Sequence, residues 1–185
     1  MSHPEEWVSA PVAPEVREQA RELRVKLDAL YGLNSQVPDR HPRELGEMGE
    51  LCLQRWFINQ GISHIYVEDD HLHNADFLMG TQKVDVKVKN RIPCQPSYTF
   101  GVHAFHLEKP IDWYVFAGWH EITNILTFYG AAHRDDILSS SQIVLPGEVA
   151  HTASLGPYHL KTKQATYEYP IWRMIGLKEW AHAIT

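Results

Sequence analysis

The chain has 185 residues, of which 44% are hydrophobic and 22% charged, as is typical of a globular protein and not of a disordered one. Its 23 acidic residues outnumber 17 lysines and arginines, and the formal charge of −6 disfavours a protein that coats nucleic acid through bulk charge. No apolar run reaches the roughly 20 residues of a membrane span. With no export signal and only Cys52 and Cys94, we expect a cytoplasmic protein with free thiols and no membrane partner.

The first third of the sequence predicts two helices. Apolar residues recur at helical spacing from Pro14 to about Tyr31, after a polar, proline-containing arm. A second helix is expected from about Pro42 to Gln60, and Gly61 ends it. We therefore divide the chain into an N-terminal arm and helix, residues 1–34, and a main domain, residues 35–185.

The main domain continues with alternating strands and helices. Strand composition and turn residues predict strands at Ile62–Glu68, Ala75–Met79, Gln82–Asn90, Asp112–Trp119 and Ile122–Tyr129. Helices are expected at Tyr98–Glu108, His133–Ser139 and Gly176–Ala183. This order predicts an α/β fold, with a mixed sheet of four or five strands flanked by helices.

The most informative strand is Gln82–Asn90. Its valines alternate with Asp85, Lys87 and Lys89, so the valines share one face and the charges the other. A two-residue turn at Gly80-Thr81 would set Asp76 opposite Asp85, with the carboxylates about 5 Å apart. Opposed carboxylates destabilise a sheet unless a cation lies between them, and a divalent cation with hard oxygen ligands meets that need.

These residues carry a resemblance to a known enzyme family. A helical Glu, a Gly that closes the helix, an Asp on one strand and D-x-K on the next occur here as Glu50, Gly61, Asp76 and Asp85-x-Lys87. In this respect residues 44–90 resemble the PD-(D/E)XK nuclease superfamily. The resemblance implies a restriction-endonuclease-like fold and an Mg²⁺- or Mn²⁺-dependent hydrolase that cuts DNA phosphodiester bonds, most simply as an endonuclease.

The resemblance also implies roles for individual residues. The metal ligands would be Asp76, Asp85, the carbonyl of Val86 and Glu50. Lys87 would orient or deprotonate the attacking water and stabilise charge on the phosphate. Glu47, one helical turn before Glu50, is the alternate to it, and Lys89 and Arg91 are candidates for contacts with DNA phosphates.

Other functions stay open at this point. A nuclease specific for junctions or branched DNA has the same motif, and so does a catalytically inactive nucleic-acid-binding module of the same fold. A zinc-stabilised interaction domain could use His71-x-His73 and His103-x-x-His106, although neither cysteine accompanies them. A homodimer is also possible, because enzymes that cut both strands of a duplex are commonly dimers.

Overall fold

The protein is described from a computed structural model, which covers residues 4–30, 40–67, 75–90, 98–148 and 165–185, and for residues 40–43 the backbone alone. Its elements, in chain order, are η1 (Pro4–Glu6), β1 (Val8–Pro11), α1 (Pro14–Leu30), α2 (Arg40–Gln60), β2 (Ile65–Tyr66), β3 (Phe77–Met79), β4 (Gln82–Asn90), β5 (Thr99–His103), α3 (Ala104–Leu107), β6 (Trp113–His120), β7 (Ile125–His133), α4 (Arg134–Ser140), β8 (Gln142–Val144), β9 (Thr166–Pro170), η3 (Ile171–Arg173) and α5 (Leu177–Ile184). None of the helices in these residues is long and apolar enough to span a membrane.

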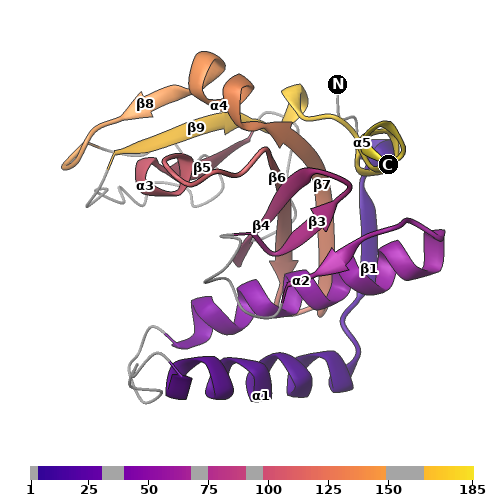
Figure 1. Cartoon of the computed structure of the whole chain (residues 1–185). Helices are drawn as coiled ribbons and strands as arrows, with labels where there is room; N and C mark the ends of the chain where they lie inside the picture. The colour runs from indigo at the N-terminus through magenta and orange to yellow at the C-terminus, as the bar shows by residue number, and fades with distance from the viewer. Residues whose placement is uncertain (1–3, 31–39, 68–74, 91–97, 149–164) are drawn as a thin grey trace.

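Two sheets form the framework of the molecule (Figure 1). The larger is mixed and six-stranded, in the order β1-β7-β6-β4-β3-β2, and only its β4–β6 pair is parallel among the described strands. A parallel pair needs a crossover connection, and the segment between β4 and β6 that contains β5 and α3 provides it. The smaller sheet is antiparallel and three-stranded, in the order β5-β9-β8.

Each face of the large sheet packs into a separate hydrophobic core. On one face Val84, Val86 and Val115 pack with apolar residues of α1, α2 and α5. On the other face Tyr114 and Phe116 pack with the small sheet, α3 and α4. Helices α1 and α2 run side by side below the sheet in Figure 1. The side-chain alternation along β4 therefore directs its valines to the helices and its charged residues to the small sheet.

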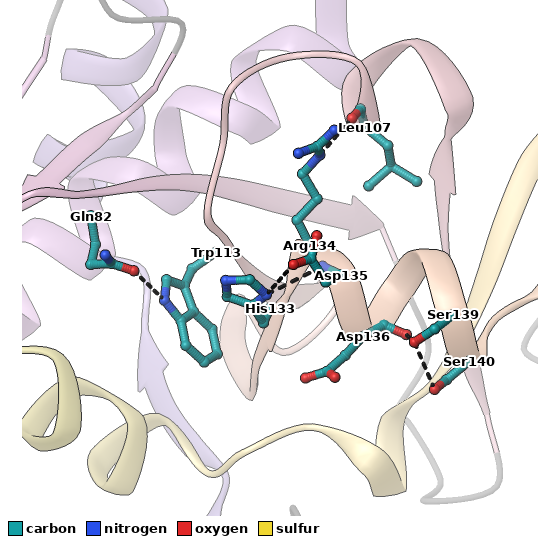
Figure 2. A network of polar contacts seen from close by, with 9 residues as sticks. All are labelled: Gln82, Leu107, Trp113, His133, Arg134, Asp135, Asp136, Ser139 and Ser140. Atoms are coloured by element: carbon teal, nitrogen blue, oxygen red, sulfur yellow. Dashed lines mark hydrogen bonds and ion pairs between the residues drawn. The ribbon is translucent and has the colours of Figure 1, made fainter.

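A set of polar contacts links α3 to α4 and the first residues of β4 and β6 to each other (Figure 2). The Arg134 Nε at the start of α4 donates to the carbonyl of Leu107 at the end of α3, at 2.7 Å. The Trp113 Nε1 donates to Gln82 Oε1 at 3.0 Å, and the Trp113 ring packs edge-on against His133. These contacts join α3 to α4 and link the start of β6 to the start of β4 and to the end of β7.

The sequence predicts several elements closely. Strand β4 has the predicted bounds, and the β3–β4 register is the predicted one, with Phe77 opposite Val84. Gly80 adopts φ +60°, the left-handed conformation that a type II′ turn requires at this place. Helix α2 ends at Gly61, where the N–H groups of Gly61 and Ile62 donate to the carbonyls of Ile58 and Phe57, as in a Schellman motif.

Two predictions about the sheets are wrong. The large sheet has six strands and not four or five, because the expected polar arm contributes β1, which pairs with β7. The expected helix Tyr98–Glu108 is instead strand β5 followed by the single turn α3. Strand β5 pairs with β9, more than sixty positions further along the chain, and a window of local sequence carries no sign of that pairing.

Candidate functional site

The charged face of β4 is largely covered, most completely at Asp85. The Asp85 and Lys87 side chains are 10% and 20% exposed, and they form an ion pair between Asp85 Oδ2 and Lys87 Nζ. The Lys87 ammonium also lies 5.9 Å from the centroid of the Tyr114 ring on the neighbouring strand β6. Burial of this kind costs free energy for charged groups, so a plain surface hairpin does not account for them.

Asp76 approaches β4 through its side chain and not through a regular ladder pair. The β3–β4 ladder ends at Phe77 and Val84, and the Asp76 N–H donates to the Val84 carbonyl at 2.9 Å. The Asp76 Oδ2 then accepts from the Val86 N–H at 2.6 Å. The carboxylate thus occupies the place where the next backbone partner of β4 would be, and the expected cross-strand pairing of Asp76 with Asp85 is absent from this ladder.

The packing of the residues on either side of Asp76 explains this geometry. Ala75 belongs to the core under the small sheet, whereas Phe77 belongs to the core under the helices. Residues two apart in a regular strand share a face, so the backbone must bend at Asp76. The bend turns the carboxylate toward β4. It also ends the β3–β4 pairing beside Val86. The Val86 carbonyl points to the same side of the strand as the Val86 N–H, and therefore toward Asp76.

Glu50 reaches this place from α2. A Cβ on the preceding residue, Gly49, would collide with Val88, so the glycine allows the helix to lie directly on β4. The Tyr66 hydroxyl on β2 donates to Glu50 Oε2 at 3.3 Å. Burial and the negative charges of Asp76, Glu47 and Asp85 raise the pKa of Glu50 well above its ordinary value, although the Tyr66 hydrogen bond opposes the change.

Lys87 is the cation within this group of carboxylates. Burial by itself would lower the pKa of the Lys87 ammonium, but the charges of Asp85, Asp76 and Glu50 outweigh burial, and the pKa is raised. Lys87 is therefore protonated at neutral pH. Glu50 of α2 and Asp76 before β3 both act on the Lys87 ammonium, as Asp85 does. The four residues that the sequence predicted for the site therefore lie within electrostatic range of one another.

Glu47, the alternate to Glu50, lies in a different cluster. Its Oε1 accepts from Arg24 Nη1 at 3.0 Å, and the same guanidinium donates from Nε to Asp28 Oδ1 at 2.8 Å. Glu47 is 6% exposed and Asp28 is fully buried. Glu47 thus joins α2 to α1, and of the two glutamates Glu50 is the one that accompanies Asp76 and Asp85.

Some of the other residues that the sequence analysis singled out are among the described residues, and some are not. The Lys89 Nζ lies 4.6 Å from the centroid of the Phe100 ring on β5. Arg91, His71, His73 and Cys94 lie outside the described residues. Cys52 on α2 is a free thiol, and burial raises its pKa to about 11.

Sequence reasoning missed two tyrosines next to the site, Tyr66 and Tyr114. A usable signal exists for the first: Tyr66 lies in an expected strand that precedes Asp76 and pairs with the hairpin, opposite Phe77. The second follows from the parallel register, which sets Tyr114 beside Asp85. The sequence does not predict that register, because it depends on how the crossover between β4 and β6 folds.

The donor set suits a hard divalent cation. It offers carboxylate oxygens and the Val86 carbonyl, and Asp85 Oδ2 has no hydrogen-bond partner among the described residues beyond its ion pair with Lys87. As the side chains stand, no three His, Cys, Asp or Glu residues in the described ranges are close enough to hold a metal ion by themselves. A divalent cation such as Mg²⁺ retains several waters, so carboxylates can hold it partly through those waters and not all by direct contact.

Comparison of the whole sequence with models of protein families gives no match, and comparison with curated proteins gives none either.

Proposed function

We propose that the protein is a metal-dependent nuclease that hydrolyses phosphodiester bonds in DNA. The observation that carries the proposal is the meeting of Glu50, Asp76, Asp85 and Lys87, which come from a helix, a bend and a strand. The order of elements around them also supports it: a helix, three antiparallel strands, a crossover and a parallel strand. We assign this arrangement to the PD-(D/E)XK superfamily and its restriction-endonuclease-like fold.

The residues present fit Mg²⁺ or Mn²⁺, and the ligands would be Asp76, Asp85, the Val86 carbonyl and Glu50. Three carboxylates act electrostatically on one ammonium here, so a divalent cation would balance the excess of negative charge. When bound, such an ion supplies Lewis-acid polarisation of the phosphate and makes a water more acidic.

Lys87 is the residue of the chain that would stabilise charge on the phosphate. Its protonated Nζ can donate to a non-bridging phosphate oxygen and stabilise the negative charge that grows there during attack. The ion pair with Asp85 and the Tyr114 ring hold the ammonium in position. Asp76 fixes the β4 backbone through Val86, so the group is held on a rigid strand and not on a loop.

A cleavage assay tests the proposal. Supercoiled, linear, single-stranded and branched DNA would be incubated with the protein in Mg²⁺, Mn²⁺ or EDTA, beside Lys87→Met. This variant keeps the apolar stem and removes the charge. Lys178→Met, at an exposed position of α5, is the matched control. We expect metal-dependent cutting by the wild type and the control, and a loss of at least about 100-fold in Lys87→Met.

Other outcomes assign the other functions. Cutting confined to the branched substrate would identify a junction nuclease with the same site. Binding of DNA without cutting in any metal would identify the inactive binding module, and metal-dependent cutting that survives in Lys87→Met would remove Lys87 from the mechanism.

A further inference from the structure

Three rings gather where β5 ends and the short helix α3 begins. The rings of His103 and Phe105 are nearly parallel, with an interplanar angle of 13° and centroids 5.9 Å apart. The Phe105 and His106 centroids are 4.0 Å apart at 35°. Phe105 is 43% exposed and has the rings of His103 and His106 as neighbours. The cluster therefore contains an aromatic side chain that is partly exposed to solvent.

This ring cluster (His103, Phe105 and His106) is attached to the candidate site. The Tyr114 hydroxyl donates to the His106 carbonyl at 2.6 Å, and the ring of the same tyrosine lies 5.9 Å from Lys87 Nζ. On the other side, His103 Nδ1 and Thr166 Oγ1 of β9 lie 3.0 Å apart, within hydrogen-bonding distance. The cluster is thus fixed between the site and the small sheet.

The rings and the ammonium groups beside them differ in charge at neutral pH. Burial, Lys89 and Lys87 lower the pKa of His103, and burial followed by Lys87 lowers the pKa of His106 to about 3. At neutral pH the imidazoles are uncharged, whereas the ammonium groups beside them carry positive charge. Neutral rings suit the faces of nucleobases, and ammonium groups suit phosphates.

We propose that His103, Phe105 and His106 form a stacking platform for an unpaired base, so that the nucleic acid enters the site as a single-stranded segment. This inference rests on the proposed nuclease function for the identity of the site beside the platform. An internal base of a duplex has both faces covered by its neighbours, so it can lie on Phe105 only where the strand is unpaired. Lys89 and Lys87 lie close enough to the rings to lower the pKa of His103, so ammonium groups would be near a phosphate attached to a base on the platform.

Binding to two matched oligonucleotides tests the platform. One is a fluorescent oligo-dT strand, and the other has the same length and phosphates but abasic sites in place of bases. Anisotropy would be measured in EDTA, so that no cutting occurs, for the wild type, Phe105→Ala and Phe105→Trp. We expect Phe105→Ala to weaken oligo-dT binding by about 5- to 100-fold and to leave binding of the abasic strand unchanged. Phe105→Trp, which keeps an aromatic ring, should bind oligo-dT as the wild type does.

Because Phe105 is partly exposed, the alanine variant should fold, and thermal melting would check this. Unchanged oligo-dT binding in Phe105→Ala overturns the platform, as does an equal loss for both oligonucleotides. Failure of the wild type to prefer oligo-dT over the abasic strand also overturns it. The cleavage assay decides the nuclease function separately: cutting with no base-dependent effect at Phe105 removes only the platform, and base-dependent binding without cutting removes only the nuclease.

Discussion

Helix α2 carries two acidic side chains one turn apart, the buried Glu47 and the half-buried Glu50, and they belong to different clusters of charge. Glu47 shares the Arg24 guanidinium with Asp28, through two hydrogen bonds of 3.0 and 2.8 Å. Glu50 lies with Asp76, Asp85 and Lys87. We call these the Arg24 cluster and the Lys87 cluster.

The two clusters differ in how charge and geometry are matched. In the Arg24 cluster a planar guanidinium with several donors holds a carboxylate from each of two helices. In the Lys87 cluster a single ammonium faces three carboxylates, and one of them, Glu50, has a strongly raised pKa. A raised carboxyl pKa means that the site disfavours the full set of negative charges. The first cluster is expected to stabilise the fold, and the second to act on a ligand.

Removal of the cation from the Arg24 cluster should give the largest effect on stability. Arg24→Met leaves two buried acids without that guanidinium, and breaking a buried pair in this way costs about 3–5 kcal/mol. For a chain of this size we expect the melting temperature to fall by about 10 °C or more. DNA cleavage measured well below that temperature should remain. Loss of cleavage in a folded Arg24→Met protein would show that the two clusters are not separate.

The Lys87 cluster should respond in the opposite way. Asp85→Asn keeps the shape of the side chain, which faces the site and not the valine core, so the fold should persist. We expect cleavage to fall by at least about 100-fold, and the rise in melting temperature caused by Mg²⁺ to disappear. Asp136→Asn, on the exposed side of α4, is the matched control. A normal Mg²⁺ response in Asp85→Asn would remove Asp85 from the metal ligands.

The sequence alone could not separate the two clusters. Glu47 and Glu50 are three residues apart on one helix face, and the partner that distinguishes them, Arg24, lies on another helix. The β4 alternation and the hairpin register were readable, because both follow from local side-chain pattern and turn chemistry. The contact of Asp76 with Val86 was not, because alternation holds only in a regular strand and the chain bends at Asp76.

Neutralisation of Glu50 should give a smaller effect that separates stability from function. Because the folded pKa of Glu50 is raised, its contribution to stability is present at low pH and is lost as pH rises toward the folded value. In EDTA at neutral pH, Glu50→Gln should therefore melt about 2–4 °C higher than the wild type, which corresponds to about 1 kcal/mol. The same variant should lose cleavage.

Glu47→Gln is the matched comparison for this variant. It weakens a hydrogen bond to Arg24, so it should melt at a lower temperature than the wild type and still cut DNA. Thermal melts in EDTA from pH 5 to 9, with cleavage assays in Mg²⁺ on the same protein preparations, would make the comparison. If Glu50→Gln is the destabilised variant and Glu47→Gln the inactive one, the roles of the two glutamates are reversed.

The smallest expected effect concerns the tyrosine that holds Glu50. The Tyr66 hydroxyl donates to the ionised form of Glu50 and opposes the rise of its pKa, so Tyr66→Phe should raise that pKa further. Cleavage needs the ionised carboxylate as a metal ligand, and the acid limb of the pH–rate profile should therefore move to higher pH. At neutral pH we expect a two- to tenfold loss, about the value of one hydrogen bond. A tyrosine that only fills space would lower cleavage equally at every pH, whereas a shifted acid limb with an unchanged plateau identifies the hydrogen bond to Glu50 as the cause.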